Sequence, residues 1–171
     1  RRSSDLAHFT GVAEATLPWG VDGCSAPNYA VPLAALALAF ARLAAPAPYP
    51  RYGDAPRRIA DAMTAHPEMV SGEWRNDLAY MRAGRGDWVT KVGAEGIQGI
   101  GIRSHGLGIA VKVGDGAKRG LHPAVVCVLD QLGLLDATQR DALAQWRETP
   151  VRNFAGIVTG AVRPVVALRA S

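Results

Sequence analysis

The chain has 171 residues, a formal net charge of +4, and 49% hydrophobic against 20% charged residues. That hydrophobic share excludes a disordered segment and favours one folded domain, residues 1–171, whose core needs neither a disulfide nor a metal. The basic residues are spread along the chain without a dense cluster or interleaved aromatics, so we expect no nucleic-acid partner.

The two cysteines, Cys24 and Cys127, lie far apart in the sequence, and we expect no signal peptide because no apolar segment follows Arg1 and Arg2. This favours reduced thiols and a cytoplasmic location, although a disulfide between them stays open at this point. The longest uncharged stretch, residues 23–41, is interrupted by Pro27 and Pro32. We therefore expect no membrane-spanning segment.

The first half of the chain predicts mainly helices. A short helix is expected from Ser4, followed by loops over residues 17–29. Pro32 suits a first helical turn, and the apolar residues after it predict a helix over 33–45 that is buried centrally. A helix over 55–65 is expected to stop at His66-Pro67, and a short one to cover 76–81.

The clearest strand pattern lies in the second half. Apolar residues recur from Ile97 to Ile102 and alternate from Leu107 to Val113, on either side of Ser104-His105-Gly106. This pattern predicts an antiparallel hairpin. Glycine weakens a strand unless its missing side chain is used, so the glycines here indicate that a backbone or a ligand approaches closely; they are Gly96, Gly99, Gly101, Gly106 and Gly108.

The remaining elements complete an α+β arrangement. A helix is expected over 116–132 with Gly133 as its stop, a second from Asp136 to about residue 147, and an edge strand over 162–168 containing Pro164. Helices, a hairpin, helices and a strand in that order indicate an antiparallel sheet with covering helices.

The first candidate for chemistry is the loop over residues 22–28. It directly precedes a predicted helix, whose N-terminal amides favour an anion. Asp22 is suited to hold an ammonium group, and Cys24 to act as a nucleophile or a metal ligand. A zinc site needs three or four protein ligands, so the residues alone favour a tight turn with an inert cysteine.

The second candidate is Lys91, in the segment from Thr90 to Gly96. Only three of the 19 basic residues are lysines, which makes a chance lysine here less expected than in an average chain. Lysine can donate and accept protons when its pKa is shifted by burial. A solvated lysine at the start of a strand is an equally good interpretation.

We expect structural roles for several other polar residues. Ser104 and His105 are adjacent in a turn and are expected to point apart, with no third group to complete a nucleophilic pair. Asp115 and Arg119 are most simply the cap and first turn of a helix, and the alternative for both is a place at the edge of a pocket.

Four segments taken together resemble the bacterial asparaginase II family of the Rhizobium type; they cover residues 21–30, 66–77, 91–96 and 106–116. The resemblance implies a fold like that of serine β-lactamases and transpeptidases, of which this chain forms half. It implies hydrolysis of the side-chain amide of L-asparagine to L-aspartate and ammonia. It also implies Lys91 as a catalytic residue, Asp22, Gly93 and Glu95 as substrate contacts, and Cys24 as one ligand of a zinc ion.

The sequence departs widely from that family, whose members are longer and carry in their first half a second active-site serine and the remaining metal ligands. The family draws its nucleophile from a serine-x-x-lysine motif, and no serine here is followed by lysine three positions later. We therefore expect the C-terminal half of a longer enzyme, with the nucleophile and the other zinc ligands outside this chain. Such a half is expected to form a homodimer or to associate with the missing N-terminal segment.

Two alternatives remain at this point. One is a penicillin-recognising serine hydrolase of the same fold, and the other is a non-catalytic amino-acid-binding module.

Overall fold

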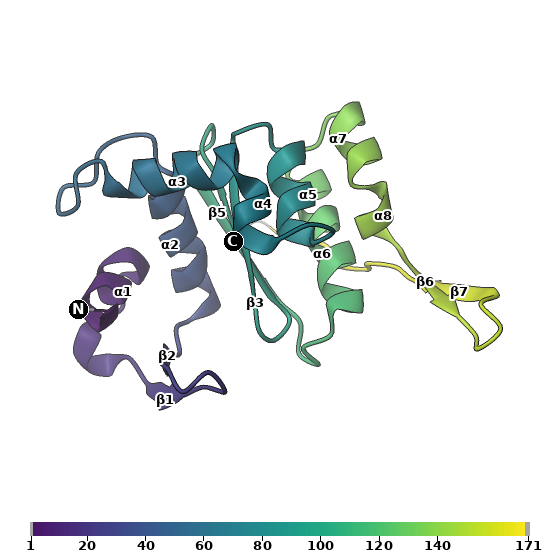
Figure 1. The fold of residues 1–171 in the computed structure, drawn as a ribbon, viewed down its shortest axis with the longest axis horizontal. Coiled ribbons are helices and arrows are strands. Elements are labelled where there is room, and N and C mark those ends of the chain that lie inside the picture. The colour runs from purple at the N-terminus through teal and green to yellow at the C-terminus, as the bar shows by residue number, and fades with distance from the viewer. Residues whose placement is uncertain (1, 170–171) are drawn as a thin grey trace.

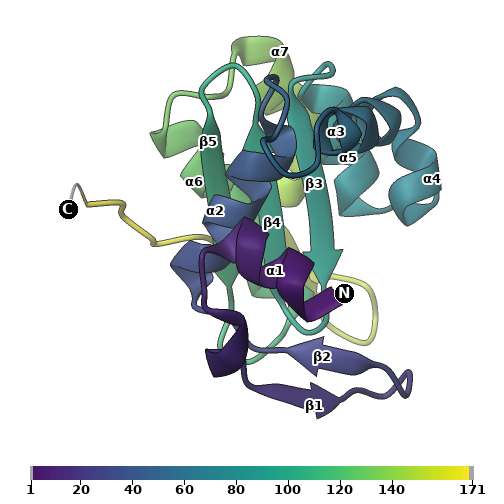
Figure 2. The same ribbon diagram turned by 90° about the vertical axis from the view of Figure 1, so that its left-hand side faces the viewer.

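The computed structural model describes residues 2–169, apart from the side chain of Arg2. A three-stranded antiparallel sheet in the order β3-β4-β5 lies at its centre, with helices on both faces (Figures 1 and 2). The strands are β3 (Trp88–Gly93), β4 (Ile97–Ile102) and β5 (Leu107–Lys112). The predicted α+β class and the predicted hairpin, β4-β5, are confirmed. Strand β3 extends the hairpin on one side and is an edge strand.

The helices agree closely with the periodicity of the sequence. They are α1 (Arg2–Thr10), α2 (Leu33–Ala44), α3 (Ala55–Ala65), α4 (Pro67–Ser71), α5 (Asn76–Ala83), α6 (Lys118–Gln131), α7 (Ala137–Ala142) and α8 (Ala144–Arg147), with a 3-10 turn at Glu14–Thr16. The predicted helix after Asp136 is divided at Leu143. Asp136 caps α7 through a capping box with Gln139.

Helix α2 explains the glycines of the hairpin. A Cβ atom on Gly99 would overlap the ring of Phe40, and one on Gly108 would overlap the backbone carbonyl of Ala37. The predicted close approach is therefore confirmed, and it is made by a helix. The prediction that α2 is buried centrally is wrong: it covers one face of the sheet with Ala37, Phe40 and Ala44, while Leu33 and Leu38 remain 44% and 39% exposed.

The opposite face of the sheet carries the main hydrophobic core. It is formed between the sheet, α5 and α6, and its fully buried large side chains include Tyr80, Trp88, Ile100, Ile102, Leu121 and Leu129. Alternation along a strand places Thr90 and Val92 on this face as well, and Lys91 on the face that α2 covers. The sheet thereby separates the lysine from the core.

Two outlying hairpins were not predicted as such. Strands β1 (Trp19–Val21) and β2 (Pro27–Tyr29) pair where a loop was expected. Strands β6 (Thr149–Arg152) and β7 (Val158–Val162) form a hairpin that projects from the body (Figure 1). The predicted strand over 162–168 is wrong, because β7 ends before Pro164, which has no N–H to donate.

Cys24 and Cys127 are both free thiols, so the disulfide left open by the sequence is absent. None of the helices within residues 2–169 is long and apolar enough to cross a membrane.

Candidate functional site

A pocket of about 400 Å³ surrounds the turn between β3 and β4. It is lined by Arg75, Lys91, Val92, Gly93, Ala94, Glu95, Gly96, Gly116 and Lys118. Three of the predicted site residues, Lys91, Gly93 and Glu95, therefore lie together. Their closeness follows from the sequence, because they end one strand and begin the next turn.

The pocket holds charges that lack a partner. Arg75, Lys91 and Lys118 are cationic and Glu95 is anionic, and among residues 2–169 none of them forms an ion pair. The Lys91 Nζ atom donates a hydrogen bond to the Val92 carbonyl oxygen at 2.7 Å. Three cations beside one carboxylate are complementary to a small ligand that carries both an anionic and a cationic group.

Close backbone contact fixes the wall that carries Glu95. Gly96 and Gly116 have φ values of +61° and +72°, and a Cβ atom on Gly96 would lie 2.6 Å from the Cα atom of Gly116. A Cβ atom on Gly116 would lie 3.1 Å from Oε2 of Glu95. The turn after β3 and the loop before α6 therefore meet where only glycine fits.

A buried polar layer lies behind the pocket. The carboxylate of Asp77 accepts hydrogen bonds from Thr90, from the Val92 amide and from Gln98. Farther along, the Tyr80 hydroxyl and Nδ1 of His122 are 3.3 Å apart. Burial, with a smaller contribution from the charge of Asp77, raises the pKa of Tyr80 well above its usual range.

His122 belongs to the same layer and faces a second, smaller hollow. Burial lowers the pKa of its imidazole, and the positive charge of Lys118 lowers it further. The hollow has a volume of about 320 Å³, and Lys118 also lines it. Tyr80 and His122 therefore form a neutral pair at neutral pH.

The loop residues Asp22 and Cys24 lie apart from this pocket. They belong to the tip of the β1-β2 hairpin, which lies at the same end of the molecule as the β3-β4 turn in both views (Figures 1 and 2). Oδ1 of Asp22 accepts hydrogen bonds from the amides of Cys24 at 2.9 Å and Ala26 at 3.1 Å. Neither Asp22 nor Cys24 lines the pocket around Lys91. In the described chain, Asp22 acts as the turn former of its own loop.

The described residues do not form a zinc site around Cys24. Its thiol is exposed, and within residues 2–169 no three side chains of histidine, cysteine, aspartate or glutamate come together to hold a metal ion. Because zinc needs three or four protein ligands, one thiol is insufficient.

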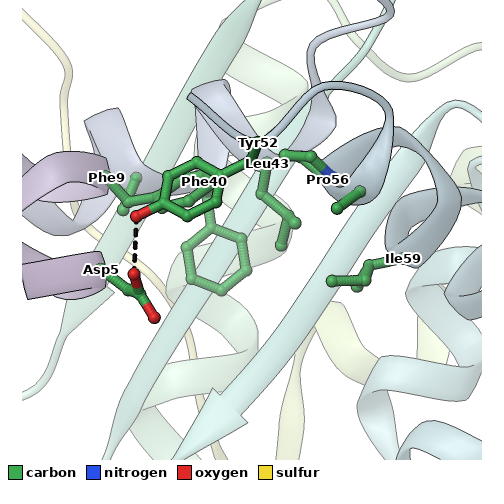
Figure 3. Close-up of a pocket in the computed structure, with 9 residues that line it drawn as sticks. Asp5, Phe9, Phe40, Leu43, Tyr52, Pro56 and Ile59 are labelled. Atoms are coloured by element: carbon green, nitrogen blue, oxygen red, sulfur yellow. Dashed lines mark hydrogen bonds between the residues drawn. The ribbon is translucent and has the colours of Figure 1, made fainter. Parts of the chain in front are cut away.

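A third pocket, of about 340 Å³, is mainly apolar (Figure 3). It lies between α1, α2 and α3, with Phe9, Phe40 and Ile59 among its lining residues. Its carboxylate, from Asp5, already accepts a hydrogen bond of 2.6 Å from the Tyr52 hydroxyl, which raises the pKa of Tyr52. This surface is unsuited to a highly charged ligand.

Ser104 and His105 do not point apart, contrary to prediction. Ser104 Oγ lies 2.7 Å from Nδ1 of His105, and Asp87 accepts hydrogen bonds from both the amide and the hydroxyl of Ser104. The carboxylate contacts the serine and not the histidine, which differs from a catalytic triad, where it orients the histidine. The predicted role of this segment as a turn still agrees with the structure.

Sequence reasoning missed Arg75 and Lys118 as pocket residues. Arg75 directly precedes α5, and Lys118 begins α6. The scarcity of lysine that singled out Lys91 applies equally to Lys118, so that signal was present. Their meeting with Lys91 depends on how the two helices pack against the sheet.

The comparisons with known proteins agree with the resemblance. No curated protein matches this chain. A family model described as L-asparaginase II matches residues 2–164, which is most of the chain. A match of this extent indicates an asparaginase-type hydrolase that acts on a small-molecule substrate. The chain belongs to the L-asparaginase II family.

Proposed function

We propose that the pocket around Lys91 binds L-asparagine and takes part in hydrolysing its side-chain amide to L-aspartate and ammonia. One observation carries this proposal. Three cations and one carboxylate without ion-pair partners among residues 2–169 line a single pocket in a chain of the L-asparaginase II family. Asparagine presents one carboxylate and one ammonium group to these charges.

Arg75 and Lys118 provide the charge for the substrate carboxylate, and Glu95 for the substrate ammonium group. A serine from a segment beyond these 171 residues attacks the amide carbon, and a base beside it takes the hydroxyl proton. Lys91 stabilises the negative charge on the carbonyl oxygen and gives a proton to the leaving nitrogen. The carbon–nitrogen bond breaks and ammonia leaves. Water then hydrolyses the acyl-serine ester to L-aspartate.

The hairpin residues have a secondary place in this proposal. Asp22 is a second candidate for the substrate ammonium group, because its hairpin lies at the same end of the molecule as the pocket. Cys24 would supply one ligand to a zinc ion only together with ligands from outside this chain. No step above depends on zinc.

Association is part of the same proposal. Several large apolar side chains are exposed, including Trp19, Val21, Phe154 and Val165. Exposed apolar surface of this kind favours a homodimer or a complex with the serine-bearing segment. Sedimentation of the chain alone and with that segment measures which of the two forms.

The direct test measures ammonia release from L-asparagine by this chain together with the serine-bearing segment, with the chain alone as the control. We expect release only from the combination. Acylation by a labelled penicillin without ammonia release would instead identify a penicillin-recognising hydrolase. Calorimetric binding of asparagine without any release would identify an amino-acid-binding module.

A further inference from the structure

Asp77 is a fully buried carboxylate whose partners are neutral. Its Oδ1 accepts hydrogen bonds from Thr90 Oγ1 at 3.0 Å and Gln98 Nε2 at 2.8 Å, and its Oδ2 accepts one from the Val92 amide at 2.9 Å. Asp77 forms no ion pair with any residue in the described range 2–169. Burying a charge in this way is costly, and an apolar residue of similar volume often stabilises a fold as well or better.

Two of the partners of Asp77 are the residues on either side of Lys91 in the sequence. Thr90 precedes Lys91 and Val92 follows it, and both flanking residues are tied to the same carboxylate. Because β3 is an edge strand, the outward Val92 amide has no neighbouring strand to bind. Asp77 supplies the missing acceptor.

Val92 connects Asp77 to the lysine side chain. Its N–H donates to Asp77, and its carbonyl oxygen accepts the hydrogen bond from Lys91 Nζ. A displacement of this residue would move the carbonyl group and the ammonium group that it holds. The carboxylate and the lysine are therefore coupled through one backbone residue, although they belong to different elements.

Asn76 orients the remaining partner. Its Nδ2 donates to Oε1 of Gln98 at 2.7 Å, which leaves Nε2 of Gln98 facing the carboxylate. Asn76 and Asp77 are consecutive residues in the first turn of α5, while Gln98 pairs with Val92 across the sheet. Helix α5 is therefore hydrogen-bonded to both β3 and β4 next to Lys91.

We propose that Asp77 is a positioning residue that sets the Lys91 ammonium group in the pocket. This inference rests on the proposed function, since it assigns Lys91 a place in amide hydrolysis. The carboxylate acts through Val92 and does not touch the substrate.

The test compares Asp77→Asn with Leu143→Ala, a core substitution between α7 and α8 that also lowers stability. Asparagine has nearly the same volume as aspartate but replaces one acceptor with a donor, so it cannot satisfy all three partners. Misplacing a catalytic group by about 1 Å costs roughly 100-fold in rate. We expect Asp77→Asn to lower kcat by about 10- to 100-fold with KM nearly unchanged, and Leu143→Ala to leave both near the wild-type values.

Thr90→Val is a milder variant for the case in which Asp77→Asn does not fold. It removes one hydroxyl donor and keeps the shape of the side chain, so we expect a smaller loss of kcat in the same direction. A wild-type kcat in Asp77→Asn, or in Thr90→Val when it is the variant that folds, would overturn the proposal. An equal loss of kcat in Asp77→Asn and Leu143→Ala would also overturn it.

A second readout does not depend on turnover. In nitrogen-15 NMR spectra, Asp77→Asn, or Thr90→Val in its place, should shift the Val92 amide and the Lys91 Nζ signal, whereas Leu143→Ala should leave both in place. If the wild-type combination releases no ammonia, the proposed function fails, and these signals still decide whether Asp77 positions Lys91. Unmoved signals would overturn the positioning role.

Discussion

Gly108→Ala tests the close packing of α2 against the sheet. The new Cβ atom would overlap the carbonyl oxygen of Ala37 and lie 2.7 Å from its carbonyl carbon, and it would lie 2.9 Å from the amide nitrogen of Ala41. These are backbone atoms, so no rotamer change relieves the overlap and the helix itself must move. Overpacking of this kind costs about 1–3 kcal/mol. Alanine also reduces the conformational entropy of the unfolded chain, which stabilises the folded state by about 0.4–1 kcal/mol.

The net loss is therefore about 1 kcal/mol, which corresponds to a fall in Tm of about 2–4 °C in a domain of this size. Circular dichroism melts measure it, with Gly160→Ala as the control, because a Cβ atom on Gly160 meets nothing within 4 Å. Adding Ala37→Gly should restore nothing, since the overlapping oxygen belongs to the backbone. A Gly108→Ala variant as stable as the wild type would refute the packing of α2.

Three further predictions follow from the polar groups. Burial lowers the pKa of His122 in the folded state, so the unfolded chain binds the proton first as pH falls. The free energy of unfolding should therefore fall as pH drops below about 6.5. Thermal melts between pH 7.5 and 5 should show this loss of stability, and His122→Gln should remove it. Glu95→Gln should lower the affinity for L-asparagine, measured by calorimetry, about 10-fold. The affinity for succinamate, which lacks the ammonium group, should not change. An equal loss of affinity for both ligands would contradict the role assigned to Glu95. Asp136→Ala should lower the urea midpoint more than Thr138→Ala, because it removes the capping box of α7; equal midpoints would count against the cap.

The sequence predicts elements well where one periodicity dominates. The alternation after Leu107 predicts β5, and the residues 55–65 predict α3 with its observed bounds. A strand beginning at Lys91 was one of two interpretations of that segment, but residues 88–90 of β3 were missed, because the apolar Trp88 and Val89 are followed by Thr90 and Lys91 and preceded by a glycine-rich turn. The burial of Thr90 in this strand is explained by its hydrogen bond to Asp77, which the sequence does not reveal.

The site is predictable only in part, for a similar reason. Lys91, Gly93 and Glu95 are close in sequence, so any fold with a turn after β3 brings them together. Arg75 and Lys118 reach the same pocket from two helices, and no local pattern specifies that meeting. The two glycine-rich loops look alike as candidate sites in the sequence, but only the one after β3 lines this pocket.

The most direct test of the central claim is the rate of ammonia release by Lys91→Ala in the combination of this chain and the proposed serine-bearing segment. Lys91 is exposed, and within residues 2–169 its ammonium group hydrogen-bonds only to its own strand, so its loss should change Tm little. General acid catalysis contributes roughly 100- to 10,000-fold to a rate, and we predict a fall of at least about 100-fold. A variant that folds normally and releases ammonia at the wild-type rate would contradict the account.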